Sequence, residues 1–131
     1  MHKNETTVRV IYGDTDKAGV VYYANYLRWF EVGRAELMRG LGFSYRELEE
    51  SGCVLPVVEI SCRYRGSARY DDLLVISTEL SAHDRVGLTF TTAIRRQGED
   101  KVLVDGFARL VAVGKDGKLS RLPEKLLKII R

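Results

Sequence analysis

The sequence predicts an α+β fold, in which an antiparallel sheet of about five strands wraps around one long central helix. The first observation is a helical spacing of apolar side chains over residues 23–42, with an apolar face wide enough to be covered by a sheet. The second is a series of strand-like segments, one before this helix and four after it, separated by turn-forming residues. With 131 residues, the chain is expected to form a single domain over residues 1–131.

The central helix is expected to begin near Tyr23 and to end near residue 40 or 42. At 100° per residue, its apolar arc consists of Tyr26, Leu27, Phe30, Gly33, Leu37, Met38 and Leu41, with Trp29 at the edge. Gly33 costs about 1 kcal/mol of helix propensity relative to Ala. A glycine in the buried face of a helix therefore indicates that a strand approaches closely there.

Arg34 also lies near the middle of this apolar arc, where an isolated charge is very unfavourable. One interpretation is a buried ion pair with Glu31, one turn earlier, or with a loop aspartate such as Asp14. The other interpretation is a group that binds an anion. Both stay open on the sequence alone, although buried charges are nearly always paired.

The other elements follow in order along the chain. Residues 6–12 alternate between two faces and are expected to form the first strand. Ser44 with Glu47 is a capping-box pattern, which predicts a short second helix. Four more strands are expected over 54–64, 73–82, 86–95 and 102–113. Pro56 marks an edge or a bulge in the first of these, and a terminal helix is expected over 124–130.

The composition is that of an ordinary globular protein, with 45% hydrophobic and 30% charged residues. A net charge of +3 is too small to indicate a nucleic-acid partner, and no basic run interleaved with aromatic residues occurs. No apolar segment approaches the roughly 20 residues that span a bilayer. The first ten residues lack an apolar signal core, so we expect a cytoplasmic protein.

Cysteines and histidines are too few and too scattered to build a site. Cys53 and Cys62 do not have a metal or redox spacing, and reduced thiols are expected. The two histidines are His2, in a terminus expected to fray, and His83. No metal and no cofactor are therefore expected, and any catalysis must depend on carboxylates.

Asp14 and Asp16 stand one residue apart in a turn that leads into the central helix. The N–H groups of about Tyr22, Tyr23 and Ala24 are expected to be free, because the first amides of a helix lack intrahelical partners. Such amides can polarise a carbonyl as an oxyanion hole does. A nearby carboxylate could attack that carbonyl or deprotonate a water, which suits acyl transfer from a thioester.

Two other interpretations of this turn are open on residue types alone. Asp-rich turns before helices are common and serve as caps and Asx-turns. A Mg²⁺ site is a weaker alternative, because two aspartates without further oxygen ligands are a poor site for that ion.

The run YGDTDKAGVVYYANYLRWFE strongly resembles the opening motif of the hotdog-fold acyl-CoA thioesterases. The most similar groups are the hydroxybenzoyl-CoA thioesterase family and its Tol–Pal-associated bacterial relatives. A second match is the RYDDL run at residues 69–73. Together with the order of strands, the resemblance covers nearly the whole chain and implies a hotdog fold and hydrolysis of acyl-CoA thioesters.

The resemblance also implies roles for individual residues. Asp16 is then the catalytic carboxylate, as nucleophile or as general base, and the backbone N–H of Tyr23 binds the thioester oxygen. Asp14 is expected to fix the turn. Other substrate-binding residues on this motif are Gly19, Val21 and Tyr22. The Tol–Pal-associated group commonly has histidine where this chain has Tyr23, and the hydroxybenzoyl-type enzymes resemble the chain more closely there.

Further along the chain, the resemblance implies an acyl pocket and a phosphate contact. The pocket residues are expected to be Leu55, Pro56 and Val57. Arg85 matches part of a basic cluster that holds CoA phosphates, although its neighbours weaken that cluster and a solvated hairpin charge is an equal alternative. The other basic residues that could serve are Arg63, Arg65 and Arg69.

The implied partners are an acyl-CoA substrate and further copies of the chain. A five-stranded sheet around one helix leaves edges exposed, so a dimer is the minimum expected, and the resemblance favours a tetramer. An acyl carrier protein is an alternative partner, and a non-catalytic acyl-CoA or acyl-carrier binding module is the rival function. A hotdog dehydratase would need a positioned histidine, and His83 is far from the turn in sequence.

Overall fold

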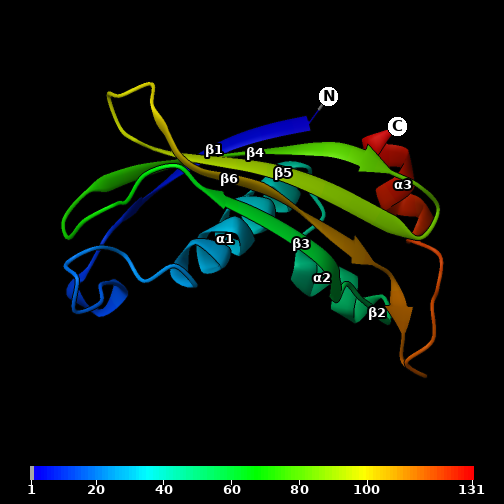
Figure 1. Ribbon diagram of the computed structural model, residues 1–131. Helices are drawn as coiled ribbons and strands as arrows, with labels where there is room; N and C mark the ends of the chain where they lie inside the picture. The colour runs from blue at the N-terminus through cyan, green and yellow to red at the C-terminus, as the bar shows by residue number, and fades with distance from the viewer. Residues whose placement is uncertain (1) are drawn as a thin grey trace.

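The computed structural model describes residues 2–131 and places a curved antiparallel sheet over one long helix, α1 (Figure 1). The elements are β1 (His2–Arg9), a 3₁₀ turn (Tyr12–Asp14), α1 (Asn25–Gly40), α2 (Tyr45–Glu50), β2 (Cys53–Val54), β3 (Val57–Tyr64), β4 (Leu73–His83), β5 (Gly87–Arg96), β6 (Val102–Val111), β7 (Val113–Gly114) and α3 (Glu124–Ile130). The strands of the main sheet lie in the order β1-β4-β5-β6-β3, and β2 pairs with β7 separately. The predicted hotdog architecture is confirmed.

The sheet wraps around α1 because the helix lies directly against its strands. A Cβ atom on Gly33 would collide with Thr78 Oγ1 and would lie 2.8 Å from Ile76 Cγ2, both on β4. The predicted close approach of a strand at Gly33 is confirmed. Most of the predicted apolar arc is buried; its most deeply buried members include Tyr26, Phe30, Leu37 and Met38.

The first strand was expected over 6–12, but it occupies His2–Arg9, and Tyr12 lies in the 3₁₀ turn. His2 is therefore part of the sheet: it pairs with Leu80, and the pairing continues without a break to Arg9 and Leu73. The inner face of the early half is polar, with Asn4 and Thr6 half-buried. The early half of β1 has no alternation of apolar and polar residues, because it is held in the sheet by backbone hydrogen bonds to β4. The sequence pattern therefore did not reveal it.

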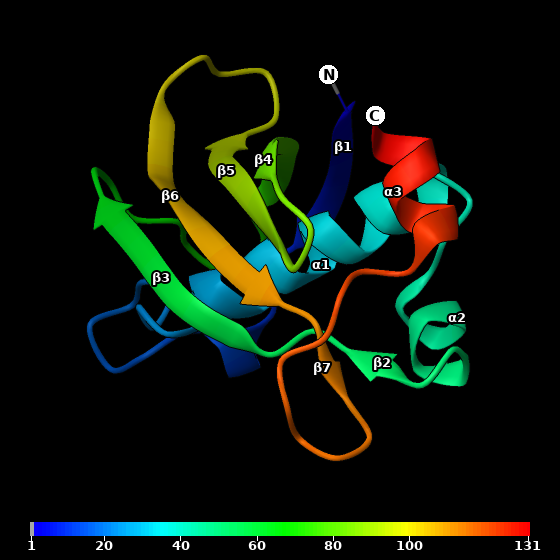
Figure 2. The same ribbon diagram turned by 90° about the vertical axis from the view of Figure 1, so that its right-hand side faces the viewer.

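The segment expected as one strand over 54–64 is divided into β2 and β3 by Leu55 and Pro56. Proline has no N–H to donate to a sheet, and its carbonyl oxygen accepts a hydrogen bond of 3.2 Å from the Val111 N–H as the chain turns. β3 then lies at the edge of the main sheet, with no strand on its outer side within residues 2–131 (Figure 2).

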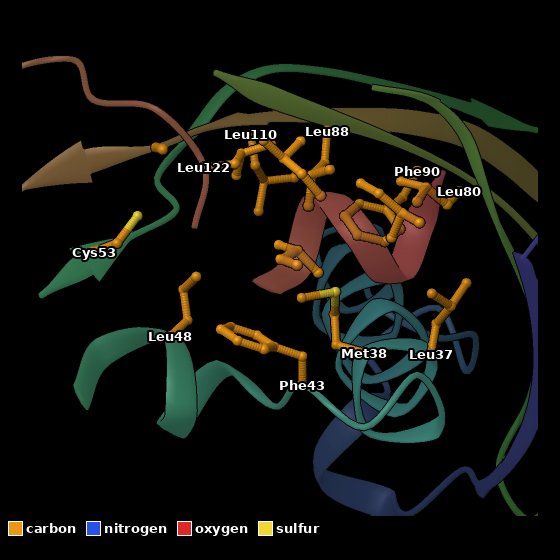
Figure 3. Packing of buried hydrophobic residues seen from close by; sticks show 14 of the residues in the cluster. Leu37, Met38, Phe43, Leu48, Cys53, Leu80, Leu88, Phe90, Leu110 and Leu122 are labelled. Carbon is orange, nitrogen blue, oxygen red and sulfur yellow. The ribbon is translucent and has the colours of Figure 1, made fainter. Parts of the chain in front are cut away.

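The core has two parts, one at each end of α1. Around the C-terminal half of α1, Met38 and Phe43 meet Leu48 of α2 beneath the inner face of β5 and β6 (Figure 3). The terminal helix α3 forms over the predicted residues, and its apolar side chains cover this end of the core. The Ser44–Glu47 capping box is confirmed, with the Glu47 N–H donating to Ser44 Oγ at 3.2 Å.

Candidate active site

The segment before α1 folds into a tight hairpin over residues 15–21. Thr15 and Val21 form an antiparallel bridge, and the Asp16 N–H donates to the Val20 carbonyl at 2.9 Å. Gly19 closes the turn with φ of 80°, a left-handed conformation that favours glycine. Val21 is buried and its N–H donates to the Ala68 carbonyl at 2.9 Å. The turn is therefore fixed to the rest of the fold on the side of Val21.

Asp14 is buried, and its hydrogen bonds hold the hairpin of residues 15–21 in place. Its carboxylate accepts the Ile11 N–H at 2.9 Å and lies 3.4 Å from Arg28 Nη1. Its carbonyl oxygen accepts the Tyr22 N–H at 2.9 Å and the Asn25 side-chain amide at 2.8 Å. Asp14 thus joins the turn to the start of α1, and its side chain has no free face for chemistry.

Asp16 has the opposite environment, because its side chain is exposed at the tip of the hairpin. Oδ1 accepts the Ala18 N–H at 2.8 Å in an Asx-turn. Within residues 2–131 this carboxylate has no ion pair, and no hydrogen bond reaches its second oxygen. The turn holds the carboxylate in place, and one oxygen remains available to a ligand.

The helix begins at Asn25, two residues later than expected, and one of the three predicted free amides is occupied. The Tyr22 N–H donates to the Asp14 carbonyl, which corrects the expectation for that residue. Among the hydrogen bonds of residues 2–131, the N–H groups of Tyr23 and Ala24 have no acceptor. No acidic residue lies in the first turn of α1, so the positive end of the helix dipole is uncompensated there.

An exposed group of tyrosines surrounds these amides. The Tyr64 hydroxyl, at the end of β3, donates to the Tyr23 carbonyl at 3.1 Å, and the two rings meet edge-on at 6.3 Å. The Tyr22 and Tyr23 rings lie 4.7 Å apart. The Tyr26 hydroxyl, in contrast, accepts the Ala68 N–H at 3.0 Å and belongs to the core. The sequence indicated the tyrosines, but not the contact between Tyr64 and the start of the helix.

The predicted acyl-pocket residues lie at the other end of β3 from Tyr64. Val57 begins the strand and Tyr64 ends it, which separates them by roughly 23 Å at about 3.3 Å per residue. Leu55 and Pro56 line a cavity of about 560 Å³, and none of the residues that line it belongs to the hairpin of residues 15–21. The chain by itself therefore does not bring this segment together with Asp16.

Arg34 and Tyr45 line the same cavity. The predicted pairing of Arg34 with Glu31 occurs only at 3.8 Å, and Asp14 pairs with Arg28 instead. Sequence reasoning singled out Arg34 but missed Tyr45. No periodic signal shows that the first residue of α2 reaches back to α1.

Arg85 lies in the β4–β5 turn, where its carbonyl accepts the Leu122 N–H at 2.8 Å, near α3 and far from the hairpin of Asp16 (Figure 1). Its neighbour Asp84 pairs with Arg109 at 2.9 Å. Arg69 is better placed beside the hairpin, because it follows Ala68, the acceptor of the Val21 N–H. Arg65 is paired with Asp105 at 3.0 Å.

Tyr45 and Tyr64 should ionise last among the tyrosines. Burial raises the pKa of Tyr45 to about 12, which outweighs the lowering effect of the Arg34 guanidinium. Partial burial of the Tyr64 ring, together with the neighbouring Cys62 thiol, also raises the pKa of Tyr64 to about 12. Because the folded pKa exceeds the ordinary value of 10.0, these phenols stabilise the fold below pH 10 and lose that contribution as the pH rises toward 12. We expect absorbance at 295 nm to show a late phase that shrinks in Tyr45→Phe.

The control for this titration is the protein unfolded in urea, in which all seven tyrosines should ionise together. An unchanged late phase in both Tyr45→Phe and Tyr64→Phe would contradict the assignment.

Within residues 2–131, no three His, Cys, Asp or Glu side chains lie close enough together to form a metal site. No helix in the described part of the chain is long and apolar enough to cross a membrane.

Comparison with known proteins gives consistent matches. The family model of the thioesterase-like superfamily matches residues 10–130. YbgC of Escherichia coli, an acyl-CoA thioester hydrolase, is 39% identical over 87 residues, which cover 66% of this chain and 65% of YbgC. YneP of Bacillus subtilis, provisionally named an acyl-CoA thioesterase, is 42% identical over 78 residues, covering 60% of this chain and 56% of YneP. Less than two thirds of either relative is therefore matched.

Among solved structures, a DHNA-CoA thioesterase from Staphylococcus aureus superposes with a TM-score of 0.94 at 28% identity. The superposition covers 99% of this chain and 89% of that protein. The two chains therefore have the same fold over nearly their whole length.

Proposed function

The chain belongs to the thioesterase-like superfamily, and from this membership we propose that it hydrolyses acyl-CoA thioesters to a free acid and CoA. The observation that carries the proposal is the pair formed by Asp16 and Tyr23. An exposed carboxylate with one free oxygen is held in a tight hairpin, and the hairpin leads directly to an amide without an acceptor at the start of α1.

In this mechanism the thioester oxygen accepts a hydrogen bond from the Tyr23 N–H. Negative charge develops on that oxygen when the carbonyl carbon is attacked, and the helix N-terminus stabilises it. Because the backbone N–H does this work, the Tyr23 side chain is free to differ from the histidine of related proteins. The Tyr64 hydroxyl donates to the Tyr23 carbonyl, in the next peptide group along the chain, and so helps to fix the backbone on the other side of the Tyr23 Cα.

Asp16 supplies the electron pair by one of two routes. As a nucleophile, its free oxygen attacks the carbonyl carbon, the C–S bond breaks, CoA leaves as thiolate, and water then hydrolyses the mixed anhydride. As a general base, it removes a proton from a water that attacks the same carbon. Both routes consume one water and release one acid and one thiol. Thiolate is a good leaving group and needs little protonation by a general acid as it departs. A site without a histidine can therefore release it.

We propose that the working unit is at least a homodimer joined along β3. This edge strand carries exposed apolar side chains, namely Val57, Val58, Ile60 and Tyr64. Antiparallel pairing of two β3 strands about their centre sets the Val57 end of one against the Tyr64 end of the other. Leu55 and Pro56 of one subunit then lie beside Asp16 and Tyr23 of its partner, so the complete site needs two copies. The resemblance further favours a tetramer of two such dimers.

A charge on this edge should separate the subunits. Ile60→Lys places two lysines near each other at the centre of the paired strands, which is a known way of blocking strand pairing. We expect a folded monomer by light scattering and circular dichroism, with thiol release reduced by about 10-fold or more. Leu119→Lys, at a 63% exposed position away from β3, is the control. It should keep the dimer and the wild-type rate of thiol release. A fully active Ile60→Lys monomer would refute the split site.

The direct test of the function is a substrate panel. Short-chain, long-chain and aroyl-CoA thioesters are supplied to the purified protein, and free thiol is followed with a chromogenic disulfide. We expect turnover above the buffer rate for at least one class. Tight binding of acyl-CoA with no thiol release from any of them would favour a binding module on the same fold, including one that serves an acyl carrier protein.

We also propose that the protein works in the cytoplasm. Cys53 and Cys62 are both free thiols, and Cys53 is buried. Unpaired cysteines are usual in a reducing compartment, where acyl-CoA is also available. Fractionation of cells that produce the tagged protein would test this location.

A further inference from the structure

The cavity of about 560 Å³ lies between α1, α2 and the segment that leads into β3. Its volume is within the range of roughly 300–1,000 Å³ that is typical of small-molecule sites. The apolar part of its wall is formed by Leu48, Val54, Leu55, Pro56 and Leu110. Such a wall fits a hydrocarbon chain.

The polar part of the wall contains a buried cation without an adequate partner. The Arg34 side chain is only 8% exposed. Its Nε and Nη1 atoms are fully buried and have no hydrogen-bond acceptor within residues 2–131. Nη2 lies 3.8 Å from a Glu31 oxygen, but the Glu31 side chain is 74% exposed and is well solvated. A guanidinium in this state is costly unless an acceptor reaches it.

A second donor lies next to Arg34. The Tyr45 hydroxyl is buried and has no hydrogen-bond partner in the described chain. It is close enough to Arg34 for the cation to affect its titration, but the two do not form a well-aligned bond. Arg34 has only donors, and a neutral phenol can also donate. The wall of the cavity therefore contains two neighbouring residues, Arg34 and Tyr45, whose buried donors have no acceptor in the described chain, together with a buried positive charge.

We infer that this cavity accepts an acyl group whose far end carries a carboxylate, held by Arg34 and Tyr45. Carboxylate oxygens are acceptors only, and their bonds to guanidinium are short and strong. The inference rests on the proposed function and adds a substrate class to it, the CoA monothioesters of dicarboxylic acids. The methylene chain lies against the apolar wall, and the thioester reaches Asp16 of the neighbouring subunit past Leu55 and Pro56.

The other charges that line the cavity do not oppose this arrangement. Glu31 and Glu49 are acidic and Arg39 is basic, so with Arg34 the lining charges balance. All three are exposed, and Arg39 is already paired with Glu36. Buried charges interact more strongly than solvated ones. The field at the inner end is therefore set by Arg34.

The test compares matched pairs of substrates that differ only in the terminal group. Succinyl-, glutaryl- and adipoyl-CoA are measured against butyryl-, pentanoyl- and hexanoyl-CoA by thiol release. We expect kcat/KM for the best diacid to exceed that of its matched monoacid by about 10-fold or more, the effect of one charged hydrogen-bonded pair. Equal or lower values for all three diacids would overturn the inference.

Variants then assign the effect to the two donors. Arg34→Gln should lower kcat/KM for the best diacid by about 100-fold and for its matched monoacid by less than about 3-fold. Arg34→Lys should recover part of the loss, and Tyr45→Phe should lower the diacid rate by about 5-fold. Arg121→Gln removes an exposed arginine outside the cavity and is the matched control, expected to behave as wild type.

A binding measurement keeps this inference separable from the proposed function. Calorimetric titration of wild-type protein with free adipate and free hexanoate needs no turnover and no variant. Selective adipate binding without any thioesterase activity would refute the proposed function, and with it the substrate class. It would leave Arg34 and Tyr45 as a carboxylate-binding site. Hydrolysis of hexanoyl-CoA with no preference for adipoyl-CoA would support the proposed function and refute this inference. Equal losses on both substrates in Arg34→Gln, with a smaller dimer fraction, would assign Arg34 to the subunit contact instead.

Discussion

Asp16→Asn is expected to lower kcat for acyl-CoA hydrolysis by about 100-fold or more, because it removes the nucleophile or base while leaving the turn intact. Asparagine keeps an oxygen that can accept the Ala18 N–H, so the Asx-turn at the tip of the hairpin survives. The fold and the proposed dimer should therefore be unchanged, and KM should change little. Thiol release on the best substrate of the panel measures the loss.

Asp116→Asn is the matched control for this variant. Asp116 Oδ1 accepts the Lys118 N–H at 3.0 Å, which is the same i to i+2 turn on an exposed loop. The same substitution there should leave activity at the wild-type level. If Asp16→Asn also retains wild-type turnover, Asp16 is only a turn-forming residue and the proposed mechanism fails.

Gly106→Ala is expected to cause a large loss of stability although it adds only one methyl group. A Cβ atom at this position on β6 would collide with the Ser61 carbonyl oxygen and would lie 2.8 Å from its carbonyl carbon and 3.0 Å from Cys62 Cα. These are backbone atoms of β3, which cannot rotate away as a side chain would. Overpacking costs about 1–3 kcal/mol when side chains can adjust, so we expect a loss of about 3 kcal/mol in the free energy of unfolding.

Urea denaturation at one fixed protein concentration checks this value, since an oligomer's apparent stability depends on concentration. Gly40→Ala is the control, because Gly40 is the last residue of α1 and a Cβ there meets no atom within 4 Å. It should leave stability unchanged or raise it by about 0.5–1 kcal/mol. A Gly106→Ala protein as stable as wild type would mean that β3 and β6 are not as closely paired as described.

Gly106 also connects stability to the proposed activity. It pairs with Cys62 in the strand that carries the proposed subunit contact. Displacing β3 should therefore weaken the dimer before the core unfolds. Reduced activity at low protein concentration, recovered at high concentration, is the expected signature.

Patterns within short stretches of sequence determined the fold class and the position of the hairpin. Apolar spacing identified α1, and the Ser44–Glu47 pair identified the start of α2, because these signals depend on residues one helical turn apart. The glycine at position 33 correctly indicated a close strand, since its cost within a helix has to be offset by packing. The run around Asp16 carried the resemblance to the thioesterase family, while the role of Asp16 itself stays a prediction.

Only the tertiary structure decided what each side chain meets. It extended β1 to His2 through pairing with β4, and it occupied the Tyr22 amide with the Asp14 carbonyl. It also left Arg34 Nε and Nη1 without a hydrogen-bond acceptor in the described chain. It also set Leu55 and Pro56 at the opposite end of β3 from Tyr64. Each of these outcomes depends on backbone groups or side chains far apart in the chain, and periodicity within one segment carries no information about such contacts.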